Sequence, residues 1–564
     1  MRRLIQIALL LCAGAVASWA APARPMVEDL TLSDGTVVRE AVFSGNEFGH
    51  YWVGPDGKRY VSSENGFTLL PPETESLTAS PDFARSPVAR TPGVQNLAPR
   101  GLVILAEFQD VRFRPMNTHA EMDSMLNGQT YQYHKSYASA KQYFHDQSLG
   151  VYNPSFDVVG PVLLPENLIY YGENTSSKGT DVRSGDMVLK ACSLASQIPG
   201  VDFSLYDNNS DGMLDFVFVI HAGYGESDSH VDSLLWPASW TMGSAVRSGK
   251  TSLPTNSPVS AYTFQGKTIS YYAYSSELNY YNTIYRPTPG YSDSVPLRAG
   301  VGVFCHEFGH VLGFPDYYDT YYGDNYQKCV TPGNWDIMDV GTYNEDGYVP
   351  PAYTPHERWW LGWGAPTLLN DSAEVTLPAD NMTAYYITKS GNAATSTSTD
   401  TIYYIENRQQ TGWDQGLPGH GLMVWRVVYN ASVWASNVPN NTAGKPRYTF
   451  LPADGRYSYS GSTGLQGDAG DPYPGVENVT SCVPFPQYPI NSIHEDESGV
   501  ITFRFMMEAD STSTLLPEVE TREGKVTNVY TLTGVEVTAG AEHLPAGVYI
   551  FRKDNGLTEK KMIR

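Results

Sequence analysis

Several kinds of feature are scarce in this 564-residue sequence, and each scarcity excludes a class of protein. Lys and Arg number 37 against 60 Asp and Glu, and the resulting net charge of −23 argues against a nucleic-acid partner, because such binding depends on basic residues. Five cysteines are too few and too scattered for a disulfide framework or a zinc ribbon. After the N-terminus, no apolar run approaches the ~18 residues of a membrane-spanning helix. Apolar residues still make up 41%, which excludes wholesale disorder.

The N-terminal segment has the pattern of a secretory signal peptide. Two arginines precede an apolar run over residues 4–17, and small residues near Ala20 offer a cleavage site. The sequence therefore predicts a signal peptide over residues 1–20 and a protein that is secreted or held on the outer cell surface. The alternative is a lipoprotein signal through Cys12, which its preceding leucine disfavours because that position is normally small.

Changes in residue pattern divide the rest of the chain into four segments. Residues 21–97 combine short alternating strands with a polar stretch rich in Pro, Ser and Thr, which predicts a propeptide and linker. Residues 98–365 mix strands and helices and predict one α/β or α+β domain. Residues 366–510 have the short alternating runs of a β-sandwich or a similar sheet-rich module. Residues 511–564 hold a few short strands of their own.

The expected elements follow from hydrophobic periodicity and turn residues. A near-continuous apolar run at the start of the mixed domain suits a strand in the middle of a sheet. In that domain the expected strands are 101–108, 216–221 and 269–275, and the expected helices are 138–146, 186–196 and 301–312. In the sheet-rich module the expected strands are 401–406, 422–428, 448–451 and 500–505.

The strongest chemical signal is the segment 305–316, which reads CHEFGHVLGFPD. Residues four apart on a helix share a face, so His306 and His310 can both bind one zinc ion. Glu307 lies one step round the helix, where its carboxylate can act as the general base for an attacking water. Gly313 can end the helix in a left-handed conformation and turn the chain back toward the metal.

A third protein ligand is expected from the loop after this helix. Asp316 follows His310 by six residues and is the first choice, with Asp319 as the fallback. A more distant glutamate of the thermolysin type is disfavoured, because Glu345 and Glu357 lack the surrounding pattern. The alternative to a metal site is an amphipathic core helix with two buried histidines.

This pattern resembles the metzincin clan of zinc peptidases, in which HExxHxxGxx is followed by His or Asp. Metzincins have a methionine turn beneath the metal, and the segment 333–343 resembles that turn with Met338 as its methionine. In several metzincins a tyrosine two residues after this methionine has a transition-state role. Here the residue offered for that role, Tyr343, follows Met338 by five.

Within that clan the chain is similar to the immune inhibitor A family of secreted bacterial metallopeptidases over about residues 40–507. Beside the zinc motif, the segments that carry the similarity include residues 102–110, 202–225 and 355–363. The resemblance implies an endopeptidase with one catalytic zinc ion that cleaves extracellular proteins. It also implies a zymogen.

The propeptide is expected to cover the cleft until the chain is cut near Arg85 or Arg90, as the resemblance and the linker composition imply. It has no unpaired cysteine to bind the metal, so Asp, Glu, His or a backbone group is left as the blocking group. An alternative from another functional class is a surface adhesin with a structural zinc ion and binding contacts from residues 366–507. Structural zinc sites usually have four protein ligands, whereas three are visible here.

A second motif, at residues 207–215, resembles the first part of an EF-hand calcium loop. Oxygen-bearing side chains stand at loop positions 1, 3, 5 and 9, and a glycine at position 6 permits the sharp turn. Position 12 is Phe218, so the segment is not an EF-hand, and an Asx-rich turn without an ion is the alternative to a structural calcium site. The expected calcium ligands are Asp207, Asn209, Asp211, the backbone carbonyl of Met213, and Asp215.

The C-terminal residues 511–564 resemble the sorting domains of the type IX secretion route of Bacteroidetes. The resemblance rests on NVYTLTGVEV from Asn528, LPAGVYI from Leu544 and a basic end, and it implies a partner in the export machinery. A plain β-sandwich end-cap explains the same strands. The sequence leaves open the oligomeric state, and whether the remaining cysteines pair or are small buried apolar residues. These cysteines are Cys192, Cys305, Cys329 and Cys482.

Overall fold

The computed structural model forms two compact units, Met1–Met507 and Glu508–Arg564. The predicted signal-peptide residues 1–17, Cys12 among them, and the linker with Arg85 and Arg90 lie outside the described residues. The structure describes residues 18–46, 49–63, 65–70, 96–174, 181–279, 297–320, 329–459, 466–508, 526–531, 537, 547–553 and 558–563.

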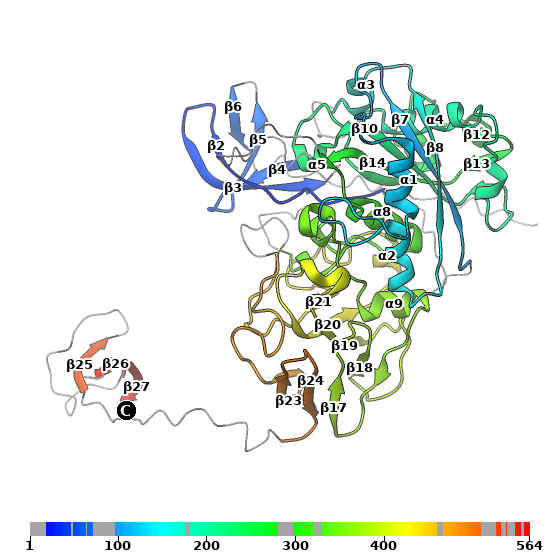
Figure 1. Ribbon diagram of the computed structural model, residues 1–564. Coiled ribbons are helices and arrows are strands. Elements are labelled where there is room, and N and C mark those ends of the chain that lie inside the picture. Colours follow the sequence, from blue (N-terminus) through cyan, green and yellow to red (C-terminus); the bar gives the residue numbers. More distant parts are fainter. Residues whose placement is uncertain are drawn as a thin grey trace, which may run out of the picture. The chain divides into compact units, whose positions relative to one another are not determined.

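A seven-stranded mixed sheet organises the first half of the larger unit (Figure 1). Its strand order is β1-β11-β14-β10-β7-β8, and β15 also pairs with β14. Strands β14, β10, β7 and β8 are parallel, whereas β11 and β1 are antiparallel to their neighbours. The bounds are β1 Ser18–Ala20, β7 Arg100–Glu107, β8 Ser155–Leu163, β10 Val217–Tyr224, β11 Ala238–Thr241, β14 Tyr271–Asn279 and β15 Leu297–Arg298.

Helices cover both faces of this sheet, which gives a mixed α/β architecture. Alternate residues of β7 point to opposite faces. Val103 and Leu105 share a buried cluster with α1, α2 and α8, while Leu102 and Ile104 share another with α4 and α6. The bounds are α1 His119–Asn127, α2 Ala140–Gln147, α4 Ser184–Ala195, α6 Met242–Arg247 and α8 Gly302–Leu312, with the shorter α3 Leu168–Gly172 and α5 Glu226–Ser229.

The N-terminal residues form a five-stranded antiparallel sheet of order β2-β3-β4-β5-β6. Its apolar side chains do not make a core of their own. Phe43 and Trp52 lie in the same buried cluster as Trp236 and Trp240, which precede and occupy β11. The predicted propeptide therefore shares a core with the central sheet. The bounds are β2 Val27–Thr31, β3 Val37–Asn46, β4 Gly49–Val53, β5 Arg59–Ser63 and β6 Gly66–Leu69.

Residues 366–507 contain two further sheets, as expected of a sheet-rich module. Their orders are β16-β18-β19-β20-β21 and β17-β24-β23-β22. Ile405 and Val424 of the first sheet face the second, whereas Tyr404 and Trp425 lie in the buried cluster that contains α8. One continuous core thus joins this module to the zinc-motif helix. The bounds are β16 Thr367–Leu368, β17 Ala373–Leu377, β18 Ala384–Thr388, β19 Thr401–Arg408, β20 Gly421–Val428, β21 Tyr448–Phe450, β22 Cys482–Phe485, β23 Tyr488–Glu495 and β24 Ile501–Phe505.

The smaller unit is a three-stranded antiparallel sheet of β25 Val526–Thr531, β26 Gly547–Lys553 and β27 Thr558–Ile563. Val529, Tyr549 and Phe551 form its small core. In the first unit, Cys192, Cys305, Cys329 and Cys482 are all free and buried, which fits small apolar core residues. Among the described residues, no helix is both long and apolar enough to cross a membrane.

Candidate active site

The side chains of His306, His310 and Asp316 converge on one point. The Nε2 atoms of the two histidines, on one face of α8, lie 3.3 and 3.4 Å from Asp316 Oδ1. Tetrahedral zinc with bonds of about 2.0–2.1 Å separates its ligand atoms by about 3.3–3.4 Å. All three residues are buried, and their ligand atoms form a group within 4.8 Å that includes Asp316 and not Asp319. The geometry fits one zinc ion.

The hydrogen bonds around these ligands also fit a metal. Nδ1 of His306 donates to the Ile337 carbonyl at 2.7 Å, and Nδ1 of His310 donates to the Phe314 carbonyl at 2.8 Å. Each Nε2 is therefore the unprotonated nitrogen that a metal requires. His306 Nε2 and Asp316 Oδ1 have no hydrogen-bond partner among the described residues, an arrangement that costs about 1–3 kcal/mol per buried atom without a cation.

A residue of the sheet-rich module holds Asp316. Asn437 Nδ2 donates to Asp316 Oδ2 at 2.6 Å, and the Asp316 main-chain N–H donates to Asn437 Oδ1 at 2.6 Å. Burial alone would raise the pKa of Asp316, whereas positive charge on His310 and His306 would lower it to about 2, so this carboxylate is ionised opposite a cation. Asn437 follows the short helix α10 (Ala431–Ala435), 121 positions after Asp316. No local pattern in the sequence marks it.

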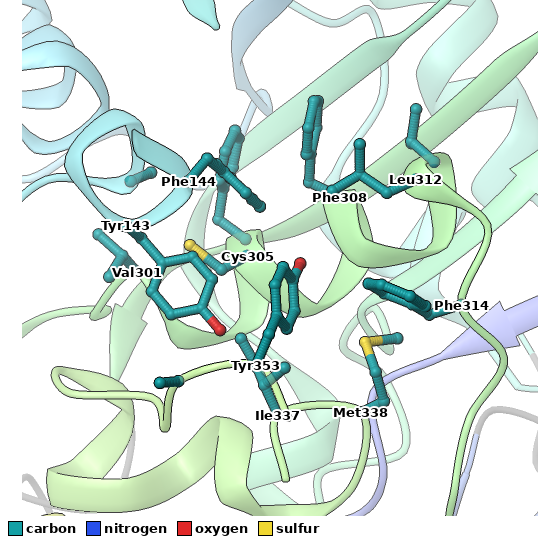
Figure 2. Packing of buried hydrophobic residues seen from close by; sticks show 14 of the residues in the cluster. Tyr143, Phe144, Val301, Cys305, Phe308, Leu312, Phe314, Ile337, Met338 and Tyr353 are labelled. Atoms are coloured by element: carbon teal, nitrogen blue, oxygen red, sulfur yellow. The ribbon is translucent and has the colours of Figure 1, made fainter. Parts of the chain in front are cut away.

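Met338 lies directly beneath α8, close to Phe314 and Tyr353 (Figure 2). A Cβ atom built on Gly309 would stand 2.7 Å from Met338 Sδ, so the helix approaches this turn closely only because position 309 is glycine. The preceding residue, Ile337, accepts the hydrogen bond from His306. The segment offered as a methionine turn therefore both supports α8 and orients a ligand.

Gly313 ends α8 in the left-handed region, with a φ of 107°. Its N–H bonds to the His310 carbonyl at 3.0 Å, and the N–H of Phe314 bonds to the Gly309 carbonyl at 3.2 Å. A side chain at position 313 would strain this turn, because L residues rarely adopt such a φ. The turn brings Asp316 back to the two histidines.

An N-terminal segment, residues 18–24, runs past the site. Its first residues form β1, which pairs with β11 as an added antiparallel strand at the edge of the central sheet. The Ala21 N–H donates to Glu307 Oε1 at 3.0 Å, so a backbone group occupies the expected general base. Trp236 Nε1 donates to the Ala21 carbonyl at 2.9 Å. Strand addition of this kind is also how an extended peptide binds a sheet edge.

Tyr343 lies in the 3₁₀ segment η7 (Val340–Gly347) and contacts the same N-terminal segment. Its hydroxyl donates to the Pro22 carbonyl at 2.7 Å and lies 3.2 Å from Ser227 Oγ. Burial raises the pKa of Tyr343 far above its ordinary value, so the hydroxyl keeps its proton and remains a donor. The structure thus places this side chain against the backbone of a strand in the cleft.

Comparison with known proteins assigns this region to a family. Residues 108–361 match the immune inhibitor A peptidase M6 catalytic domain. The chain contains a peptidase M6 catalytic domain. Immune inhibitor A of Bacillus thuringiensis subsp. alesti is 26% identical over 243 residues, which are 39% of this chain and 31% of that protein. The pre-pro-metalloprotease PrtV of Vibrio cholerae serotype O1 strain M66-2 is 23% identical over 248 residues, 40% of this chain and 24% of that protein. The match therefore spans a third or less of these relatives.

The acidic loop of the M6 domain differs from the cluster of His306, His310 and Asp316. Lys267 Nζ donates to Asp207 Oδ2 at 2.6 Å, and the N–H groups of Asp211 and Gly212 donate to the same carboxylate at 3.0 Å. Gly212 makes the expected sharp turn with a φ of 87°. In the described part of the chain, the clustered His, Cys and acidic side chains do not include Asp207, Asp211 or Asp215. Calcium at this loop stays a prediction.

A second cluster joins the N-terminal sheet to the M6 domain. His50 Nδ1 lies 3.6 Å from Glu226 Oε1, and His50 Nε2 lies 3.2 Å from Asp232 Oδ1. A single metal ion takes only one nitrogen of an imidazole. Because different ring nitrogens face the two carboxylates, the geometry suits ion pairing rather than a shared metal. His50 also stacks on Trp236 with the ring centroids 5.4 Å apart.

Proposed function

We propose that the chain is a secreted, metzincin-type zinc endopeptidase that hydrolyses peptide bonds of extracellular proteins and is made as a zymogen. The observation that carries the proposal is the convergence of His306, His310 and Asp316 with Glu307 beside them, in a peptidase M6 domain. Glu307 is buried on the same helix and already contacts the backbone of a strand added to the sheet edge.

The residues of the site have distinct roles in this reaction. When bound by the two histidines and Asp316, zinc supplies Lewis-acid activation of the peptide carbonyl and of water. Glu307 takes the proton of the attacking water and passes it to the leaving nitrogen. β11 pairs with the extended substrate, while Trp236 and Tyr343 donate hydrogen bonds to its carbonyls, as they do to residues 21 and 22 here.

The N-terminal segment supports latency. Cleavage near Ala20 would remove β1, but residues 21–24 would stay beside the site, where the nitrogen of Ala21 donates to Glu307. Tyr343 adds a hydrogen bond from its hydroxyl to the Pro22 carbonyl, and Arg24 pairs with Asp346. Among the blocking groups left open by the sequence, this arrangement favours a backbone group. Activation then requires that residues up to about the predicted linker leave the cleft.

Substitution of Glu307 by Gln tests the catalytic proposal. The variant should keep zinc and the fold but lose casein cleavage, because Gln cannot accept the proton. Zinc content by mass spectrometry and the circular dichroism spectrum should match the parent protein, and Glu374→Gln, at an exposed position of strand β17, is the control that should remain fully active. Residual cleavage by a processed, zinc-loaded Glu307→Gln protein near the parent rate would show that the base is wrongly assigned.

The zymogen proposal has its own test. The purified precursor should be inactive, and activity should appear as the chain is cut near Arg85 or Arg90. N-terminal sequencing of the active form should then read from the linker onward. An active form that begins upstream of residue 60 would contradict the proposal, since its chain would not have been cut in the predicted linker.

Location and accessory ions complete the proposal. We infer export through the signal peptide of residues 1–20, with the tail of residues 511–564 recognised by a type IX-like machinery of a Bacteroidetes bacterium. The three strands of the smaller unit are compatible with such a tail. A structural calcium ion at residues 207–215 is proposed as a stabiliser of the central sheet, because β9 (Met213–Leu214) leads from that loop toward β10.

A further inference from the structure

The side chain of Arg24 fills an acidic pocket beside the proposed catalytic centre. Its Nη2 pairs with Asp346 Oδ1 at 2.5 Å, and its Nη1 donates to Asn279 Oδ1 at 3.1 Å. The guanidinium carbon lies 5.9 Å from the centroid of the Tyr343 ring. Arg24 is only 6% exposed, and a cavity of about 40 Å³ remains around it. The arginine is therefore a well-fitted occupant.

The position of this pocket ties it to substrate binding. Val303, one turn before the ligand His306 on α8, lines the pocket, as does Tyr343. The chain reaches the pocket three residues after Ala21, whose N–H contacts Glu307. This stretch has left β11, whose pairing ends at Ala20, and the Arg24 N–H donates to the Ser227 carbonyl at 2.8 Å. A substrate that follows the path of residues 21–24 would place a residue from the C-terminal side of its cleaved bond here.

The lining retains a strong charge preference when Arg24 is removed. Three carboxylates line the pocket, those of Asp228, Glu277 and Asp346, and Arg24 is the only cation among the described residues of its lining. Glu277 already accepts hydrogen bonds from three N–H donors, so its oxygens are satisfied within the protein. Asp346 and Asn279 accept hydrogen bonds from the guanidinium.

A neighbouring lysine offsets only part of the charge of Asp346. Lys135 Nζ donates to Oδ2 at 3.0 Å, whereas Arg24 pairs with Oδ1, so departure of Arg24 leaves one carboxylate oxygen facing the pocket. Burial alone would raise the pKa of Asp346, but Arg24 and Lys135 hold it below its ordinary value. The Asn279 amide is fixed by its hydrogen bond to the Asp346 carbonyl at 2.7 Å.

We propose that this pocket is a specificity subsite for an arginine or lysine of the substrate, within the first four residues after the cleaved bond. Asp346 and Asn279 are its specificity-determining residues, and Arg24 is the stand-in that the chain itself supplies until the N-terminal segment leaves. This inference rests on the proposed peptidase function. It adds a substrate class, polypeptides with exposed basic residues, which the net charge of −23 also attracts.

Cleavage profiling of the processed protein tests the subsite. A proteome-derived peptide library analysed by mass spectrometry should show Arg and Lys enriched at one of the four positions after the cleaved bond. Two synthetic peptides that differ only by Arg or norleucine at that position should then be compared. The parent protein should cleave the Arg peptide with a kcat/KM at least about tenfold higher than the norleucine peptide, because the buried carboxylate attracts the positively charged side chain.

Asp346→Asn should remove this preference by lowering kcat/KM for the Arg peptide about tenfold, toward the value for the norleucine peptide. Asparagine has nearly the same size and tolerates the left-handed φ of 62° at this position. Glu345→Gln is the matched control, because Glu345 also pairs with Lys135, at 3.1 Å, but is exposed and does not line the pocket. Its Arg-to-norleucine ratio should equal that of the parent.

The outcomes separate this inference from the function on which it rests. If the processed parent cleaves no peptide, the proposed function fails. If it cleaves peptides with no enrichment of basic residues after the cleaved bond, only the subsite assignment is overturned. The assignment is also overturned if Asp346→Asn keeps the parent ratio, or if Glu345→Gln lowers that ratio equally. The library result for the parent decides the question even if Asp346→Asn does not fold.

Discussion

The proposed zinc site and the acidic loop at residues 207–215 both show side chains at metal-ligand spacing, yet their local structures differ. At the zinc site, His306 Nε2 and Asp316 Oδ1 lack hydrogen-bond partners in the described part of the chain and face one another at 3.3 Å. In the acidic loop, Asp207 is already bonded by Lys267 and by two main-chain N–H groups. Spacing alone therefore identifies a loop shape, whereas converging unsatisfied atoms indicate an ion.

Of the changes that test this comparison, removal of metal should have the largest effect on activity and stability. A chelator should abolish peptidase activity, and stoichiometric zinc should restore it, because the three converging ligands are the proposed catalytic centre. Zinc at about 1,000 times its Kd stabilises a folded protein by about 4 kcal/mol, so the melting temperature should fall with the activity. Calcium added to the chelated protein should not restore cleavage. Full activity after complete zinc removal would show that the cluster of His306, His310 and Asp316 does not bind a catalytic metal.

Substitution of Asn437 should have an intermediate effect. Asn437→Ala removes both hydrogen bonds to Asp316 and should weaken zinc affinity about 10–100-fold, the usual effect of losing a partner of a metal ligand. Competition with a chromogenic chelator measures it. The matched control is Asn441→Ala, which loses a contact to Thr320 on the same loop but none to Asp316. Equal zinc affinity in the two variants would contradict a positioning role for Asn437.

The acidic loop should give the smallest effect. Calcium at about 1 mM should raise the melting temperature of the parent by about 2–4 °C and leave kcat/KM unchanged, since the loop lies outside the catalytic centre. Lys267→Met removes the competing ammonium and should enlarge the shift, while Asp207→Asn should abolish it. If calcium leaves the melting temperature of all three proteins unchanged, the calcium prediction is wrong and the loop is an Asx-rich turn without an ion.

Local and distant parts of the site differ in how far the sequence predicts them. His306, Glu307 and His310 lie on one helical turn, so helix periodicity alone places them, and a glycine turn of three residues brings back Asp316. Asn437 reaches the same carboxylate from 121 positions away. The contact between Asn437 and Asp316 depends on how α10 packs against the peptidase domain, and residue spacing in the sequence does not predict that packing.

The fold shows the same limit. Alternating and continuous apolar runs predict three strands of the central sheet, β7, β10 and β14, and four of the sheet-rich module, because burial on one or two faces leaves a local pattern. They do not predict β8 or β11 of the central sheet. The partner of each face leaves no such pattern. Tyr404 and Trp425 read as strand residues, but only the structure shows them in one core with α8. Likewise, Arg24 and Asp346 are 322 positions apart, so the acidic pocket is not visible in the sequence.

Because Asn437 holds Asp316 through two hydrogen bonds, the proposed catalytic centre depends on residues beyond the segment that matches the peptidase family. A chain truncated after residue 361 would keep every residue of the zinc motif, yet it would lose Asn437 and uncover the apolar surface that Tyr404 and Trp425 cover. Such a fragment would keep the proposed metal ligands but lose the hydrogen bonds that position Asp316. Substitutions in residues 366–507 can therefore change how tightly the metal is held. Exchange of this module between relatives would also exchange a residue that positions a metal ligand.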